Sequence, residues 1–483
     1  MWSAAEDASW GRAVARGLLR GDTSPVAGRL AGNGPQAWIA FDQEMRGLQR
    51  AHGSRISCRR LEARLCHPDG RVRAAALAAW RNPPLQLVLI RCADWVPQVR
   101  DRARRVLGRA VAAHDPAEAL TGLTPFVLWL GGRRHGAWAV EQLEAALSGR
   151  YSLLAAWWRP GRPCTTWSRN ALTPGQRDLI LARLRGSADL ATRRFATRVT
   201  LAAGRCGVRE AARRAASEPD PVTGRMWTDA VLAAMAADGP DDEAVDTLLG
   251  SRSARVRAAG VTALRRAGRA ARAVDHLADR SGEVRACARW LLGQGGGDPY
   301  AYYRELVTDP HRVSGHAVTG FREVAGQADG PLLFPLLHHP DGAVRAAALA
   351  TLRGLGLVAE DALLLAMLED PSASVAREAA LCLLPVAERL DPAALAARTG
   401  PEWPAHTRRA AFRLLEGRGG SAELRACVAM LTDPDPGLGR RARDRVLGWN
   451  WLSTLDEGEA HQAELGALLA RSARLLSVDR LRM

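Results

Sequence analysis

The sequence contains no lysine, because all 67 of its basic residues are arginine. A GC-rich genome of bacterial type is the simplest explanation for this bias and for the abundance of alanine. Without lysine, the chain cannot form the glycine-rich phosphate loop that ends in Lys. The eight cysteines show no paired ligand spacing. We therefore predict buried free thiols, with no zinc or iron–sulfur site and no cofactor.

Long apolar runs and strand-like patterns are also absent. No segment approaches the roughly 20 apolar residues of a membrane helix. Glu6 and Asp7 precede the first apolar run, which is unlike a secretory signal. We therefore expect no membrane insertion and no leader, and the unpaired cysteines add to the prediction of a cytoplasmic protein. No stretch alternates apolar and polar residues over a useful length, so the fold should be nearly all α.

One phrase is written twice in this chain. Residues 67–80 read HPDGRVRAAALAAW and residues 339–352 read HPDGAVRAAALATL, which agree at eleven of fourteen positions. From residue 256 to residue 438, related phrases recur at spacings of 28, 29, 31, 31, 31 and 32 residues. A period of this size is typical of chains that grow by stacking similar units. The related phrases surround Val99, Val256, Val284, Val313, Val375, His406 and Leu438.

Each phrase predicts a turn followed by a helix. Asp69 and Asp341 are placed to cap the helix that starts after the Pro-Asp-Gly turn. His67 and His339 occupy the same turn, which favours a structural role for them. A second apolar run precedes the phrase, as in GPLLFPLLHH before Pro340, and indicates a partner helix. One helix pair cannot bury its apolar face alone, so we predict an all-α solenoid of stacked helix–turn–helix repeats that pack closely through alanine.

The phrase DPxxxVRxAAxxAL resembles the HEAT-repeat family, in particular the short HEAT-like type also found in phycobilisome-lyase-like proteins. The resemblance is strongest over residues 60–110 and 245–450. It implies a charged ladder between adjacent repeats, built from the turn Asp and the Arg that follows Val, although Gly439 stands where that Arg is expected. Such solenoids mostly serve as binding surfaces, so the resemblance implies a scaffold and no particular chemistry. The implied ladder residues are Asp69, Arg73, Arg257, Arg285, Asp341, Arg345 and Arg377.

Composition suggests four regions in the chain. Residues 1–58 and 449–483 are expected to cap the two ends. Residues 59–240 form basic repeats, interrupted at 149–177 by a segment with three tryptophans, three prolines and no acidic residue. Residues 241–448 form charge-balanced repeats. A glycine run near 293–298 is interpreted as a hinge between two halves of the solenoid.

The positive charge lies in the first half of the chain. Residues 1–240 contain 36 arginines and 20 acidic residues, whereas residues 241–483 contain 31 of each. A solvated helix face would tend to balance its charges, so this excess favours an anionic partner, either nucleic acid or another protein with an acidic surface; the alternative is a charge with no specific role. The predicted contact residues are Arg59, Arg60, Arg100, Arg102, Arg104, Arg105, Arg159, Arg162, Arg193 and Arg194, with Trp157, Trp158 and Trp167 as anchors or stacking platforms.

A catalytic alternative rests on one pair of residues. Some HEAT-like solenoids are alkylpurine DNA glycosylases, in which a Trp and a catalytic Asp can lie four residues apart. Only Trp38 has an Asp at that spacing, Asp42. The rest of that family's pattern is not recognisable around the pair, so we favour a scaffold that performs no chemistry and keep the nucleic-acid-binding protein and the glycosylase as alternatives.

Overall fold

The computed structural model describes residues 4–52, 60–81, 83–113, 115–149, 172–449 and 459–480. All regular secondary structure in these ranges is helical. The chain divides into two compact units, Met1–Val256 (unit 1) and Arg257–Met483 (unit 2). No helix in the described ranges combines the length and the apolar character needed to cross a membrane.

The described helices of unit 1 follow one another along the chain. They are α1 (Ala4–Leu19), α2 (Val26–Arg29), α3 (Pro35–His52), α4 (Leu61–Leu65), α5 (Gly70–Ala79), α6 (Leu85–Cys92), α7 (Pro97–Ala113), α8 (Pro116–Gly131), α9 (Ala137–Ser148), α12 (Pro174–Arg185), α13 (Leu190–Ala202), α14 (Val208–Ser217), α15 (Pro221–Ala237) and α16 (Asp242–Leu249).

Unit 2 continues the series from α17, which contains the boundary between the units. Its described elements are α17 (Ala254–Arg266), η3 (Ala270–His276), α18 (Gly282–Gln294), α19 (Pro299–Thr308), α20 (Gly315–Phe321), η4 (Gln327–Asp329), α21 (Gly330–Leu333), η5 (Pro335–His338), α22 (Gly342–Gly354), α23 (Asp361–Met367), α24 (Ala373–Leu383), η6 (Leu384–Arg389), α25 (Pro392–Ala397), α26 (Ala405–Arg418), α27 (Gly420–Met430), α28 (Pro436–Leu447) and α29 (Glu459–Arg480).

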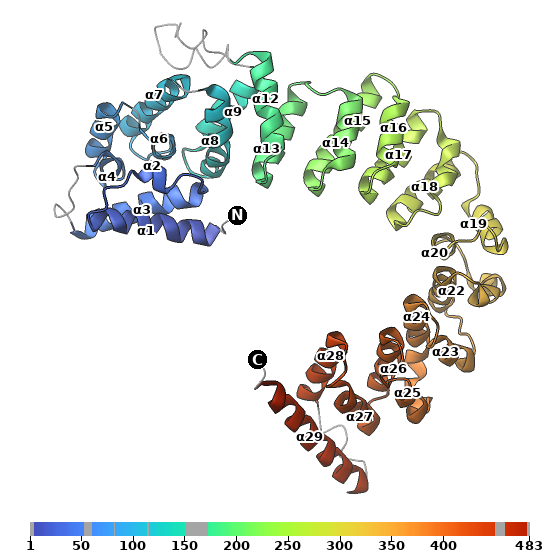
Figure 1. Ribbon diagram of the computed structural model, residues 1–483. Helices are drawn as coiled ribbons and strands as arrows, with labels where there is room; N and C mark the ends of the chain where they lie inside the picture. Colours follow the sequence, from blue (N-terminus) through green and yellow to red (C-terminus); the bar gives the residue numbers. More distant parts are fainter. Residues whose placement is uncertain are drawn as a thin grey trace. The chain divides into compact units, whose positions relative to one another are not determined.

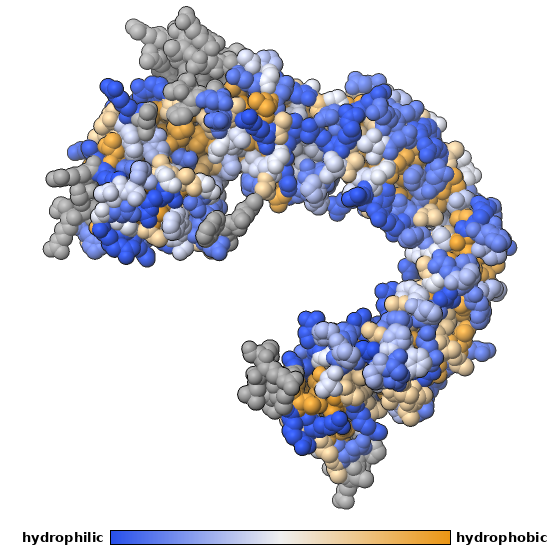
Figure 2. Space-filling model, viewed as in Figure 1, coloured by the Kyte–Doolittle hydropathy of each residue, from blue (hydrophilic) through white to orange (hydrophobic). Residues whose placement is uncertain are grey.

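Successive helices pack in pairs, as α6 does with α7, α14 with α15 and α27 with α28, and alternate helices such as α20, α22, α24 and α26 also pack on one another (Figure 1). This arrangement confirms the predicted all-α solenoid of HEAT-like helix pairs. Stacking gives each unit a continuous apolar interior, because every pair covers the exposed apolar face of the next. Figure 2 shows hydrophilic residues over most of the visible face, with small apolar patches between them.

The predicted helix starts are confirmed at the two copies of the repeated phrase. Asp69 and Asp341 each accept a hydrogen bond of 2.8 Å, from the backbone N–H of Arg71 and Ala343. The apolar run before the second copy is divided into the short α21 and the 3₁₀ helix η5, because Pro335 lacks the N–H that a continuous helix needs.

The structure describes the glycine run and a small part of the tryptophan-rich segment. The glycine run lies inside unit 2, in the turn between α18 and α19, where Gly296 has a φ of 79° that suits a residue without a Cβ. Its role as a hinge stays a prediction. Most of the tryptophan-rich segment 149–177, residues 150–171, lies outside the described residues.

Candidate functional site

An arginine at the start of one repeat's second helix reaches the turn of the next repeat. Arg73 of α5 donates two hydrogen bonds to the carboxylate of Asp94, from Nε at 3.0 Å and from Nη2 at 2.8 Å. Parallel double bonds of this kind suit the planar guanidinium and fix its orientation. The same arrangement occurs, at 2.7–3.0 Å, in the pairs Arg73–Asp94, Arg194–Asp220, Arg257–Asp279, Arg345–Asp370 and Arg408–Asp433.

Each rung of this ladder also braces the two turns that it joins. The carboxylate of Asp94 accepts the backbone N–H of Val96 at 3.0 Å, which holds the turn before α7. On the other side, Nη1 of Arg73 donates to the backbone carbonyls of His67 and Pro68, both at 2.8 Å. One guanidinium therefore ties its own turn to the next one.

The ladder partners of Arg73 and Arg345 differ from the prediction. Asp69 and Asp341 were expected to pair with these arginines, but they cap their own helices and form no ion pair with them within the described residues. The reason is geometric, because each Asp lies at the N-cap of the same helix while the arginine side chain extends toward the following turn. The acceptor is Asp94 for Arg73 and an equivalent turn aspartate for Arg345.

Two other predicted ladder arginines have different partners. Arg285 pairs with Glu323, with its Nε 3.2 Å from the carboxylate. Arg377 pairs only locally, with its neighbour Glu378 at 3.0 Å. Ala376 occupies the ladder position in that helix, and a shift of one residue turns a side chain by about 100° around a helix.

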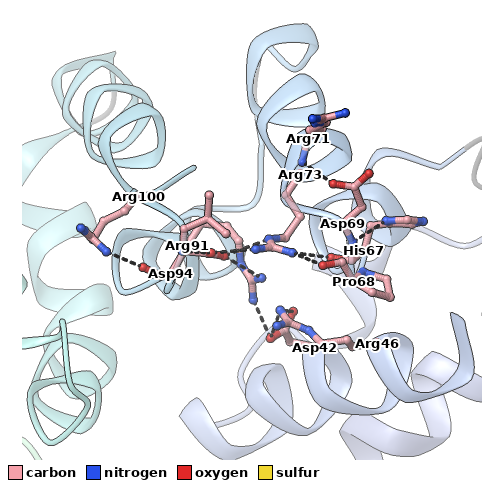
Figure 3. A network of polar contacts seen from close by, with 11 residues as sticks. Asp42, Arg46, His67, Pro68, Asp69, Arg71, Arg73, Arg91, Asp94 and Arg100 are labelled. Atoms are coloured by element: carbon pink, nitrogen blue, oxygen red, sulfur yellow. Dashed lines mark hydrogen bonds and ion pairs between the residues drawn. The ribbon is translucent and has the colours of Figure 1, made fainter. Parts of the chain in front are cut away.

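In unit 1 the ladder pair Arg73–Asp94 is part of a buried cluster of charged side chains, which Figure 3 shows. Arg91 of α6 joins two carboxylates, with its Nη2 2.5 Å from Asp42 of α3 and its Nη1 3.3 Å from Asp94. Arg46 of α3 also reaches Asp42, at 3.3 Å. The side chains of Arg73 and Asp94 are completely buried. Three guanidiniums therefore share two carboxylates inside the unit.

Burial and charge together set the ionisation of this cluster. Burial by itself would raise the pKa of Asp42, but the guanidiniums of Arg91 and Arg46 outweigh it and hold that pKa below its usual value. Burial and the adjacent Asp42 carboxylate raise the pKa of the Cys66 thiol well above its usual value, and burial raises the pKa of Cys92 to about 12. These two thiols stay protonated at neutral pH, as expected of inert buried cysteines.

The buried cluster also bears on the glycosylase alternative, which rests on Trp38 and Asp42. Asp42 is held between two arginines, and Trp38 is only 2% exposed, inside the packing of the first helices. A base-excising enzyme needs the Trp and the Asp on an accessible surface. The structure instead makes Trp38 a core residue and Asp42 the anion of an ion-pair network, which removes the geometric basis of the glycosylase interpretation.

Beside the cluster lies a surface that we call the basic face. It consists of Arg100 and Arg104, one turn apart on α7, and of Arg133, Arg134 and His135 in the turn between α8 and α9. Burial, together with the nearby Arg100, Arg134 and Arg104, holds the pKa of His135 below its usual value. Within the described residues, none of these four arginines forms an ion pair with a carboxylate. Arg134 is exposed, and Arg100 and Arg104 each give one donor to a backbone carbonyl and keep others for a ligand.

Tryptophans fix the direction of several of these arginines. The guanidinium of Arg104 lies 4.4 Å from the ring centre of Trp138, and that of Arg133 lies 4.6 Å from the ring centre of Trp129. Stacking of this kind holds a cation in place without neutralising it. Aromatic rings therefore position two of the arginines of the basic face, Arg104 and Arg133.

A further tryptophan is partly open to solvent. Trp95, in the turn before α7, is 52% exposed. The guanidiniums of Arg46 and Arg73 lie 4.4 and 4.2 Å from its ring centre. The buried cluster thus supports an exposed indole next to the basic face.

The predicted contact residues are dispersed by the structure. Arg100 and Arg104 lie on the basic face. Arg102, on another side of α7, donates to the carbonyl of Ala74, and Arg105 is exposed. Arg60 donates to the backbone carbonyls of residues 22–24, which is a structural contact. Arg194 belongs to the ladder, and Arg193 lies half-buried beside it in the sequence. Arg59, Arg159, Arg162, Trp157, Trp158 and Trp167 lie outside the described residues.

Sequence reasoning missed several residues that matter here. The true ladder acids had a signal, because Asp94 and Asp279 each stand six residues before the Arg that follows Val in their own repeat. Arg133, Arg134 and His135 had none, because they lie outside the repeated phrase and meet α7 only through the packing of helices.

The fold of the described residues is an α-solenoid of stacked HEAT-like helix pairs. No protein-family model matches the chain, and no curated protein matches it. Among solved structures it is similar to yeast importin-beta (Kap95p), with 11% identity and a TM-score of 0.33 over 97% of this chain and 63% of that one. It is also similar to Kap121p bound to Pho4p, with 13% identity and a TM-score of 0.36 over 91% of this chain and 54% of that one. The chain spans less than two thirds of the length of either.

Proposed function

We propose that this protein is a helical-repeat scaffold that binds an anionic macromolecular partner through the basic face of unit 1. The observation that carries the proposal is the grouping of Arg100, Arg104 and Arg134 around His135 without an ion pair to any described carboxylate. Unpaired guanidiniums at close range repel one another, and a bound carboxylate or phosphate would relieve that repulsion while accepting their hydrogen bonds.

The charge of the two units supports the same proposal. Unit 1 contains 38 arginines and 24 acidic residues, a net charge of +14, whereas unit 2 contains 29 and 27, a net charge of +2. Unit 1 should therefore supply most of the long-range attraction for a polyanion. We further propose, from the repeated phrase alone, that the repeats are of the short type found in phycobilisome-lyase-like proteins, and the cytoplasmic location stays a prediction from the sequence.

Nucleic acid is the second candidate partner, and Trp95 is the observation that favours it. A half-exposed indole beside arginines is the combination on which proteins stack unpaired bases. An acidic protein segment would use the arginines and leave the indole with a smaller role. The two candidates thus differ in whether binding depends on Trp95.

The test is a binding measurement on the full chain across a salt series. The probes are fluorescent duplex DNA, single-stranded DNA, RNA and polyglutamate. The test variant is R100E/R134E, which avoids Arg104 because Asp101 and Glu141 already lie near it. The matched control is R105E/R109E, which reverses two exposed charges elsewhere on α7. We expect R100E/R134E to weaken binding at least tenfold and to flatten the salt dependence, and the control to stay within about threefold.

The outcome separates the candidates. Equal losses in both variants would mean that net charge alone attracts the probe, and the basic face would then not be the site. A probe preference for single strands that W95A removes would favour nucleic acid. Binding of polyglutamate that W95A leaves unchanged would favour an acidic protein segment.

A further inference from the structure

A groove crosses three helices of unit 2 and is independent of the basic face. It has a volume of about 500 Å³ and is lined by residues of α24, α26 and α28. Figure 1 shows these helices in succession, with α23, α25 and α27 packed beside them. Small and apolar residues such as Ala380, Ala410 and Leu438 form much of the lining. Four arginines complete it, namely Arg377, Arg409, Arg413 and Arg441.

Three of these arginines recur at a regular spacing. Arg377, Arg409 and Arg441 stand 32 residues apart, one on each helix. On α22, which precedes them in the stack, the corresponding residues Ala346 and Ala347 are alanine. The row of arginines therefore belongs to the groove and not to the repeat as such.

The ion pairs of these arginines lie on their buried side, so the guanidinium groups remain exposed on the outer side. Arg409 is 58% exposed but its partner Asp435 is 10% exposed, and Arg441 is 48% exposed but its partner Glu416 is 7% exposed. The Nε of Arg409 donates to the carboxylate of Asp435 at 2.6 Å, and the Nε of Arg441 donates to the carboxylate of Glu416 at 2.8 Å. Each arginine thus keeps an outer edge of N–H donors for a ligand.

Arg413 is the member of the lining without such a support. It lies one turn after Arg409 on α26 and is half-buried, and no described carboxylate pairs with it. A half-buried guanidinium in an apolar setting gains most from a bound carboxylate, because little solvent screens the attraction. The part of the groove beside Arg413 therefore favours a negative charge.

We propose that this groove binds an extended segment of a partner protein that carries aliphatic side chains between acidic residues. Aliphatic groups would pack over Ala373, the exposed alanine of the lining, and carboxylates would meet Arg413 and the outer edges of the row. Nucleic acid fits less well, because Phe412 is 1% exposed and offers no face for stacking, and the imidazole of His406 is tied through Nε2 to the backbone carbonyl of Asp370. The small net charge of unit 2 also gives little attraction for a polyanion.

The experiment selects ligands without assuming their sequence. A library of random ten-residue peptides is displayed and selected on the full chain that carries R100E/R134E, so that the basic face does not contribute. The selected peptides are then measured by fluorescence polarisation against three further variants of that protein. R413E reverses the charge of Arg413, A373W narrows the groove from the exposed Ala373, and R389E is a control that reverses an exposed charge outside the lining.

We expect the selected peptides to combine Asp or Glu with Leu, Ile or Val. R413E and A373W should weaken their binding about tenfold or more, and R389E should change it less than twofold. Circular dichroism at 222 nm checks that each variant keeps its helices. The proposal is overturned if no peptide is enriched, if the enriched peptides lack acidic residues, or if R413E binds as tightly as its parent. It is also overturned if a single-stranded oligonucleotide, and no peptide, binds with dependence on Arg413.

Discussion

A rung of unit 1 and a rung of unit 2 show the same ladder pair in different electrostatic settings. In unit 2, Arg345 and Asp370 form a one-to-one pair with side chains 15% and 11% exposed. In unit 1, Arg73 and Asp94 are completely buried, and Arg91 shares the same carboxylate. The comparison shows that one repeated device can serve as an ordinary joint in one place and as the base of a charged surface in another.

Removing the shared carboxylate of unit 1 should have the largest effect on stability. Asp94→Asn leaves the buried Arg73 and Arg91 without their common anion, and we expect a loss of about 3–5 kcal/mol. The equivalent change in unit 2, Asp370→Asn, should cost about 1.5–3 kcal/mol because Arg345 keeps access to water. Urea unfolding of the full chain, followed at 222 nm, measures both. Equal losses would mean that the buried setting of unit 1 adds nothing.

Acidic pH should weaken the unit 1 cluster, whereas a contrasting carboxyl of unit 2, which takes up its proton at a higher pH, should respond with the opposite sign. The pKa of Asp42 lies below its usual value, so its contribution to stability is present above pH 4 and is lost as the pH falls through the folded-state pKa. Burial raises the pKa of Glu423 in α27, so its ionised form disfavours folding and its contribution has the opposite sign. Asp42→Asn should therefore destabilise at pH 7 and lose its effect in acid. Unfolding curves between pH 7 and pH 2 would contradict this if the difference between D42N and wild type did not shrink.

Neutralising Glu423 should have a smaller effect. Its partner Arg445 is 49% exposed and can return to water, so Glu423→Gln should change stability by about 1 kcal/mol or less at pH 7. The same urea experiment provides the value. A loss as large as that of Asp94→Asn would mean that unit 2 also depends on buried charge.

The basic face should couple anion binding weakly to protonation. Burial and the nearby Arg100, Arg134 and Arg104 lower the pKa of His135 in the free protein, and a bound anion would raise it. Affinity for an anionic probe should thus rise a few-fold as the pH falls below 6.5, and His135→Gln should remove this rise. Binding heats in two buffers of different ionisation enthalpy measure the proton uptake. An unchanged pH profile in H135Q would place the coupling elsewhere.

The fold was predictable because its information is local and repeated. The Pro-Asp-Gly turn, the capping Asp69 and the apolar spacing all lie within one short phrase, and each copy supports the others. The ladder was predictable in kind, since Arg73 and Arg345 do reach aspartates. Its partners were not, because the choice between Asp69 and Asp94 depends on where a side chain points after the repeats have stacked.

The candidate site was less accessible to sequence reasoning. Composition located the excess of arginine in the first half of the chain. It could not distinguish Arg100, which belongs to the basic face, from Arg102, which donates to a backbone carbonyl of α5. Both lie on one helix two residues apart. Their different roles follow from rotation around α7 and from the turn at Arg134, which is distant in sequence.

The ladder also has a mechanical meaning. Each rung joins only neighbouring repeats, so tension along the chain is carried from one guanidinium to the next carboxylate in series. The series is broken at Arg100, which donates to the backbone carbonyl of Asp94 and pairs with no described carboxylate, and at Ala376, which stands in the ladder position of α24. A pulling force should therefore separate the repeats first at these two places, and a partner bound to the basic face would act as a clamp across the one in unit 1.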